Sequence, residues 1–208
     1  MRYRWLVWGV ALVVGIGGGV GVAFATRSSG HSPTPTFPRS SSQAQITWKA
    51  GQKAAPDFAL RDQQGRPISL QRFHGRPVLL TFIDPLCTTF CPLEARVLDR
   101  LLAQLPASQR PAIVSVSVNR LGDNQTAYRH DARKWRLTSD WHWAVGSQAA
   151  LSRVWNAYAI GVAVDPKTKD VTHTEAAYLV DASGHQRALY LWPFGSTALL
   201  GELQTLAG

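Results

Sequence analysis

The sequence predicts an α/β domain in which helices cover both faces of a mixed sheet. The apolar run Pro77–Ile83 is typical of a strand buried on both faces, and Ile113–Val118 is expected to be another strand. Apolar residues at helical spacing separate them, as expected for parallel strands joined by a helical crossover. A turn at Ala182-Ser183-Gly184 indicates a closing antiparallel hairpin. With 208 residues, 45% of them hydrophobic, the chain can form one domain plus an appended segment.

The first 26 residues are predicted to be a short cytoplasmic tip followed by a transmembrane helix that anchors the chain. About 21 largely apolar residues, Trp5–Ala25, are long enough to span a bilayer. Arg2 and Arg4 precede this run and Arg27 alone flanks its other end, so the positive-inside rule places the rest of the chain on the extracytoplasmic side of the cell membrane. The sequence Ala23-Phe24-Ala25 leaves a cleaved signal peptide open.

A tether and a small hairpin are expected before the main sheet. Residues 27–50 are rich in Ser, Pro, Thr and Gly, which predicts a flexible linker, and the folded domain is expected over residues 51–208. Two short extended segments, Phe58–Leu60 and Ile68–Leu70, flank Gln63-Gln64-Gly65, whose composition favours a hairpin turn.

The later elements follow from helical periodicity and turn signals. Apolar residues at helical spacing predict a helix over Pro92–Leu105, and Pro92 suits its first turn. The same reasoning predicts helices at Asn124–Trp135, Ser147–Tyr158 and Thr197–Leu206, and strands at Ala176–Asp181 and Gln186–Leu191. This order of elements resembles the thioredoxin fold, with the first hairpin as an amino-terminal extension.

The charge of the chain argues against one class of partner. The formal net charge is +9, but the basic residues are scattered and form no run that would follow a phosphate backbone. We therefore expect no nucleic-acid binding. A basic surface would equally attract an anionic lipid face or an acidic protein, and charge alone does not separate these partners.

The two cysteines of the chain, Cys87 and Cys91, lie between a buried strand and the helix expected from Pro92. The amino terminus of a helix favours anions, so a thiolate there has a lowered pKa. If the helix begins near Thr88, the two sulfurs lie one turn apart on one face and can approach one metal ion or each other.

Two thiolates would select copper(I) over harder ions, and an imidazole would complete a trigonal site. The candidate is His173, in the loop that leads into the strand Ala176–Asp181. In thioredoxin-like folds this loop lies against the first strand-to-helix loop, where the cysteines are. The alternative is a histidine bonded only to a carbonyl group or to Glu175.

The domain from about Ala55 to Gly208 resembles the Sco/SenC family of copper chaperones for cytochrome c oxidase. Three groups of residues carry the resemblance: the C-x-x-x-C-P motif from Cys87 to Pro92; the lead-in Pro56-Asp57-Phe58-Ala59-Leu60-Arg61-Asp62 with Gly65 and Phe73-His74-Gly75; and His173 with Tyr178-Leu179-Val180-Asp181. The resemblance implies that Cys87, Cys91 and His173 bind copper, as copper(I), with copper(II) left open.

The partner that the resemblance implies is the copper-bearing subunit of cytochrome c oxidase, whose dinuclear copper centre the chain would help to assemble without turnover of its own. Other copper chaperones or thiol reductases would be further partners, and the amino-terminal helix would hold the chain at the membrane.

Three alternatives use the same cysteines. A structural disulfide is one, although so short a loop restrains the unfolded chain little. A thiol–disulfide reductase is the second, with Cys87 and Cys91 as its catalytic pair. A thiol peroxidase is the third, because residues 88–92 with Glu94 partly match the peroxiredoxin pattern; Cys91 would then attack peroxide and Cys87 resolve the product.

Overall fold

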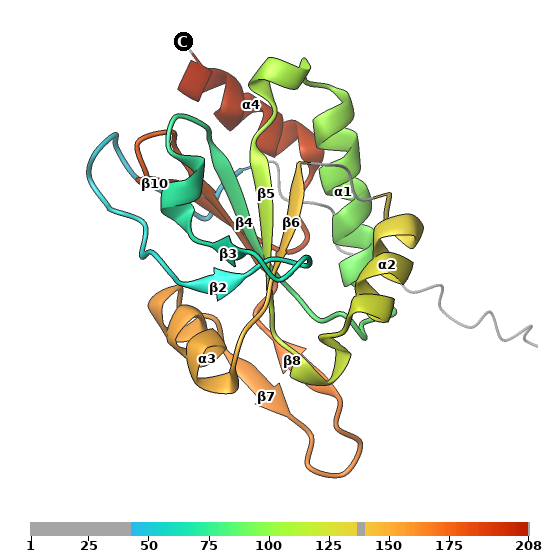
Figure 1. Ribbon diagram of the computed structural model, residues 1–208. Helices are drawn as coiled ribbons and strands as arrows, with labels where there is room; N and C mark the ends of the chain where they lie inside the picture. Colours follow the sequence, from blue (N-terminus) through green and yellow to red (C-terminus); the bar gives the residue numbers. More distant parts are fainter. Residues whose placement is uncertain (1–42, 137–139, 208) are drawn as a thin grey trace, which may run out of the picture. The chain divides into compact units, whose positions relative to one another are not determined.

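Six strands form one mixed sheet in the computed structural model, which describes residues 43–136 and 140–207 (Figure 1). The predicted anchor lies outside the described residues, as does the linker up to residue 42. In spatial order the strands are β1 (Ile46–Thr47), β10 (Gln186–Leu191), β9 (Ala176–Val180), β4 (Val78–Ile83), β5 (Ala112–Ser117) and β6 (Trp141–Ala144).

The centre of the sheet confirms the first two predicted strands. All residues of β4 and β5 are buried, and the two strands are parallel with Leu79 opposite Ile113. Two of their three polar residues satisfy each other, because the hydroxyl groups of Thr81 and Ser115 are 2.8 Å apart. On its other side β4 pairs with β9 in antiparallel orientation, and β9 continues into β10 as the predicted hairpin.

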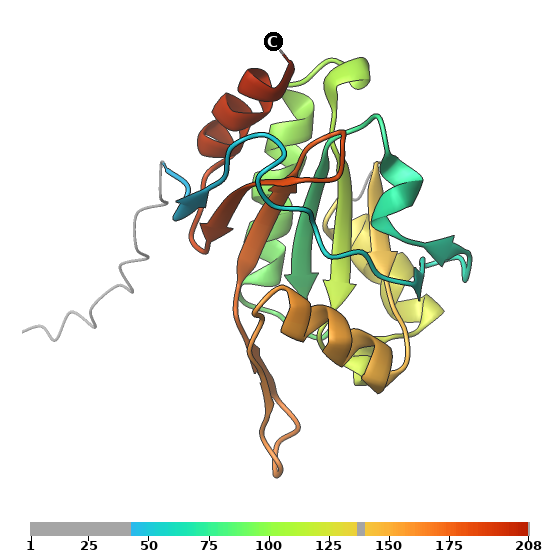
Figure 2. The ribbon, with the colours of Figure 1, turned by 90° about the vertical axis from the view of Figure 1, so that its left-hand side faces the viewer.

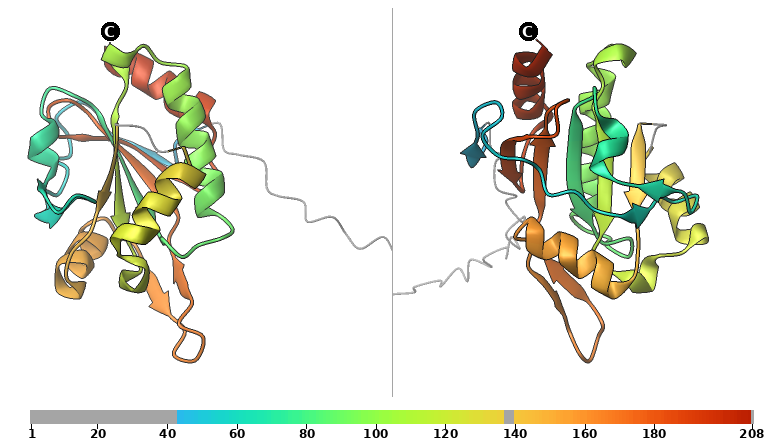
Figure 3. Two further views of the ribbon diagram at one scale, coloured as in Figure 1. Left: turned by 45° about the vertical axis from the view of Figure 1, so that its right-hand side comes forward. Right: turned by 60° about the vertical axis from the view of Figure 1, so that its left-hand side comes forward.

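Helices cover both faces of the sheet, as predicted (Figure 3). Apolar side chains of α1 (Cys91–Ala103), α2 (Gln125–Lys134) and α4 (Ser196–Ala207) pack in one core cluster. Those of α3 (Gln148–Ala157) pack in a second cluster, together with the amino-terminal hairpin. That hairpin, β2 (Leu60–Arg61) and β3 (Pro67–Ile68), is shorter than predicted and forms a separate small sheet.

Several strands were not predicted. The edge strand β6 consists of tryptophans, a histidine and an alanine, a composition that indicates core but no particular secondary structure. The hairpin of β7 (Val162–Val164) and β8 (Val171–His173) extends away from the sheet (Figure 2), and most of its residues are exposed, so no apolar alternation marks it.

The folded part begins earlier than the predicted boundary at residue 51. β1, inside the segment assigned to the linker, pairs with β10, and Gln45 N–H donates to the Leu189 carbonyl at 2.9 Å. Both residues of β1 are exposed, so backbone pairing forms the strand and hydrophobic pattern cannot reveal it. None of the helices within the described residues is both long and apolar enough to cross a membrane.

Candidate metal centre

The topology brings the cysteine loop and the histidine loop to one end of the sheet. Cys87 lies in the turn after β4, Cys91 is the first residue of α1, and His173 ends β8 just before β9. Because β4 and β9 are antiparallel neighbours, the end of β4 lies beside the start of β9. This neighbourhood explains why residues 82 positions apart in the chain can meet.

A tight turn holds Cys87 in place. The buried side chain of Asp84 accepts a hydrogen bond from the Leu86 amide at 2.8 Å, and its carbonyl accepts one from the Cys87 amide at 3.0 Å. Gly122 packs against the turn so closely that an added Cβ atom would lie 2.5 Å from Pro85 Cγ. The position of the first cysteine therefore depends on a second loop.

The two cysteines are free thiols with opposite electrostatics. The Cys91 amide, at the start of α1, donates to Cys87 Sγ at 3.3 Å. Hydrogen bonds from Cys91, chiefly from its thiol, outweigh burial and lower the pKa of Cys87 to about 4. The hydrogen bond between the two thiols is also the largest cause of the raised pKa of Cys91, and burial is the second. The pair is thus a half-exposed thiolate beside a buried thiol.

The predicted helix is confirmed: α1 begins at Cys91, one residue before Pro92, so the start near Thr88 that would place both cysteines on the helix is not found and Cys87 precedes α1. Pro92 is in the first turn, as expected. The two cysteines nevertheless meet, because the turn at Asp84 places the Cys87 sulfur at the free amide of the helix end.

His173 faces the cysteines from the opposite loop. Its side chain is 3% exposed, and Nδ1 donates to the Thr174 carbonyl at 3.1 Å. Nε2 lies 3.1 Å from Glu175 Oε1, but the angles are not those of a hydrogen bond, so Nε2 lacks such a partner among the described residues. Burial lowers the pKa of His173, yet the Glu175 carboxylate, the Thr174 carbonyl and the charge of Asp84 together raise it by more.

The tightest group of potential ligands differs from the predicted set. Ligand atoms of Cys91, His173 and Glu175 all lie within 4.8 Å of one another, whereas Cys87 joins this group only through Cys91. From the sequence, Glu175 was considered only as a partner of His173, which it also is. Nothing in its spacing distinguishes it from an ordinary surface glutamate.

A second carboxyl group, Glu94, was missed as part of the site. It lies one turn after Cys91 on α1, is fully buried, and neither of its oxygens has a hydrogen-bond partner among the described residues. Burial, and then the charge of Glu175, raise its pKa well above the usual range. Acidic groups therefore crowd the inner side of the cysteine pair.

The donor set suits copper. Two sulfur atoms and an imidazole nitrogen are ligands that copper(I) prefers, and a carboxylate adds a harder oxygen donor. The unpartnered Nε2 of His173 and Oε2 of Glu175 are atoms that a metal ion could satisfy.

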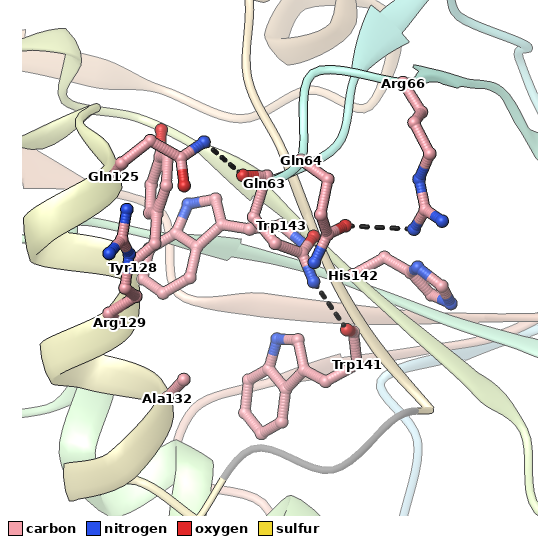
Figure 4. A pocket seen from close by; sticks show the side chains of 10 residues that line it. All are labelled: Gln63, Gln64, Arg66, Gln125, Tyr128, Arg129, Ala132, Trp141, His142 and Trp143. Carbon is pink, nitrogen blue, oxygen red and sulfur yellow. Dashed lines mark hydrogen bonds between the residues drawn. The ribbon is translucent and has the colours of Figure 1, made fainter.

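One cavity lies elsewhere, beside the edge strand β6 (Figure 4). Its volume is about 580 Å³, and none of its lining residues belongs to the cysteine cluster. There the side-chain amide of Gln63 takes the place of a further strand, because it donates to the Trp141 carbonyl and accepts from the Trp143 amide. The cavity therefore lies at the edge of the sheet, where Gln63 occupies backbone groups of β6, and it is separate from the candidate metal centre.

Comparison with known proteins gives one family. The SCO1/SenC family model matches residues 47–207. Copper-bound ScoI from Bradyrhizobium japonicum has a similar fold, with a TM-score of 0.60 at 20% identity over 74% of this chain and 99% of that one. This likeness confirms the predicted α/β, thioredoxin-like fold.

Five curated relatives also match, among them the following two. Chloroplastic peroxiredoxin Q from Sedum lineare is 29% identical over 117 residues, which are 56% of this chain and 59% of the relative. A protein from Stutzerimonas stutzeri named "Putative copper-binding protein" is 27% identical over 143 residues, 69% of this chain and 67% of the relative. The match to peroxiredoxin Q thus covers less than two thirds of the length of that protein.

Proposed function

The chain belongs to the SCO1/SenC family, and from this premise we propose that it is a copper chaperone for the dinuclear copper centre of cytochrome c oxidase. The observation that carries the proposal is the approach of His173 to Cys91, whose amide donates to the sulfur of Cys87, a thiol with a lowered pKa. The copper named in the descriptions of two matched proteins supports it.

The geometry suggests an order of events. Cys87, ionised and half-exposed, is the first ligand to meet incoming copper. Cys91 gives up its proton as its sulfur binds, and His173 completes the site through Nε2, because Nδ1 is held by the Thr174 carbonyl. Release follows by ligand exchange with the copper-bearing subunit, which begins at the exposed Cys87.

We propose the same placement in the cell that the sequence predicts. Residues 1–26 anchor the chain in the membrane, and the segment from residue 27 up to β1 tethers the folded domain on the extracytoplasmic side. The position of β1 supports a shorter tether than residues 27–50. Other copper chaperones and thiol reductases remain proposed partners.

One observation favours a second candidate function, reduction of disulfides in the partner. A thiolate beside a protonated thiol is the arrangement needed for exchange: Cys87 attacks the partner's disulfide, Cys91 resolves the mixed disulfide, and the chain leaves oxidised at Cys87–Cys91 while the partner gains two thiols. A peroxidase would instead need the thiolate at Cys91, whose pKa is raised.

Mixing the full chain with the soluble copper-bearing domain of an oxidase separates the two functions. The copper-loaded chain and the reduced, copper-free domain should give the absorption of a dinuclear copper centre. The reduced, copper-free chain and the oxidised domain should give two thiols in the domain, with loss of the two thiols of the chain, only if the chain is a reductase. Failure of copper transfer, with thiols released, would replace the chaperone proposal by the reductase.

A further inference from the structure

We propose that Glu175 is a fourth ligand of the copper site and that it favours copper(II) over copper(I). The inference rests on the proposed function, because it requires copper at Cys87, Cys91 and His173. It adds an oxygen donor that the C-x-x-x-C-P motif and the distant histidine do not contain.

The geometry places the carboxylate among the ligands. An oxygen of Glu175, a ring nitrogen of His173 and Cys91 Sγ are mutually within 4.8 Å, a separation that allows all three to contact one ion. Glu175 directly precedes β9, whose pairing with β4 fixes it opposite the cysteine turn. Its backbone carbonyl accepts a hydrogen bond from the Trp192 amide at 3.0 Å, which anchors the residue.

The polar atoms of Glu175 and His173 are poorly satisfied without an ion. Oε2 of Glu175 and Nε2 of His173 are both buried and lack hydrogen-bond partners among the described residues. Oε1 and Nε2 are 3.1 Å apart in an arrangement unsuited to a hydrogen bond. A metal ion bound by both atoms would satisfy them together.

Glu94 is the less suitable carboxyl group. It lies behind Cys91, is fully buried, and is not among the three residues whose ligand atoms converge. The side chain of Glu175 is 18% exposed, so it can turn toward an ion that arrives from solvent. Glu175 is therefore the carboxyl group better placed to bind the ion.

Charge balance gives the preference for copper(II). Two thiolates and one carboxylate carry three negative charges, so copper(II) leaves one uncompensated whereas copper(I) leaves two. Uncompensated charge is costly where water is excluded. A carboxylate is also a harder donor than a thiolate and suits a divalent ion better.

The test compares Glu175→Gln with Asp170→Asn in the full chain. Both variants remove one negative charge from the same stretch of chain, but Asp170 is exposed on the β7–β8 hairpin and takes no part in the cluster. In E175Q, copper(II) affinity relative to copper(I) should fall about tenfold, which raises the copper reduction potential by about 59 mV. D170N should keep the wild-type potential.

A second measurement addresses the wild-type chain directly. X-ray absorption of its copper(II) form should give two sulfur and two nitrogen or oxygen ligands, with one oxygen contribution changed in E175Q. An unchanged potential and ligand set in E175Q would overturn the role of Glu175 and leave the copper site intact. Absence of copper binding in the wild type would overturn the proposed function as well.

Discussion

At the scale of single residues, the site depends on the difference in pKa between two neighbouring thiols. Cys87 is half-exposed and accepts hydrogen bonds from Cys91, whereas Cys91 is buried against two glutamates. Exposure alone would not ionise Cys87 at neutral pH, because an ordinary cysteine has a pKa near 8.5. The hydrogen bonds from Cys91, at the start of α1, lower the pKa of Cys87.

Replacing Cys91 by alanine should therefore raise the pKa of Cys87 from about 4 toward the ordinary cysteine value. The thiol that donates the largest stabilising hydrogen bond is lost, although the backbone amide remains. Ultraviolet thiolate absorbance against pH measures the change. Thr89→Ala serves as the control, because Thr89 contributes less, and its curve should shift only slightly. A Cys87 that titrates near pH 8.5 in the wild type would contradict this account.

Glu94 should make the copper-free protein less stable as the pH rises. Its pKa is raised in the folded state, so its contribution is fully present below the unfolded pKa and is lost as pH rises toward the folded pKa. Glu94→Gln stays neutral and should increase the free energy of unfolding at pH 8 by about 1–3 kcal/mol, because burial costs an ionised carboxylate more than an amide.

Urea unfolding at pH 5 and pH 8 measures the effect of Glu94→Gln. The wild type should lose stability between the two values, and the variant should lose clearly less. An equal loss in both proteins would mean that Glu94 is not the group responsible.

At the scale of elements, the loop that carries Cys87 is shaped by a glycine in another loop. Gly122 lies against Pro85, and there is no room for a side chain between them. Gly201, in the middle of α4, is exposed, and a Cβ atom there would meet nothing within 4 Å. The two glycines offer a matched pair of substitutions with opposite expectations.

Gly122→Ala should destabilise the protein by about 1–3 kcal/mol, the usual cost of overpacking, and weaken copper binding because the cysteine turn must move. Gly201→Ala should stabilise it by about 0.5–1 kcal/mol, because alanine favours the helix, and leave copper binding unchanged. Thermal unfolding and copper titration of both variants measure these effects. Equal copper affinity in G122A and the wild type would show that the turn tolerates the displacement.

Elements with a strong apolar pattern were predictable. The buried runs of β4 and β5 and the leucine-rich face of α1 follow from hydrophobic burial, which is written in the sequence. β1 and the β7–β8 hairpin were not, because exposed backbone pairing forms them and leaves no hydrophobic periodicity. β6 was missed because its side chains indicate burial without indicating the strand.

At the scale of the whole molecule, sheet order determines which distant residues meet. The pairing of β4 with β9 brings the loop of Cys87 beside that of His173, an encounter expected from the family resemblance and not from spacing. The carboxyl groups of Glu94 and Glu175 could not be foreseen, because their importance comes only from their burial near the sulfurs. The types of ligand can thus be predicted from the sequence, whereas the residues that surround them can be identified only from the structure.

The most direct test of the central claim is copper stoichiometry and affinity of the reduced full chain, beside His173→Ala. We expect tight binding of one copper ion per chain, weakened by the substitution because a proposed ligand is lost. His185→Ala is the control, since His185 lies at the β9–β10 turn bonded to Ser183, and it should bind as the wild type does. Absent binding, or binding equally tight without His173, would contradict a copper site built from Cys87, Cys91 and His173.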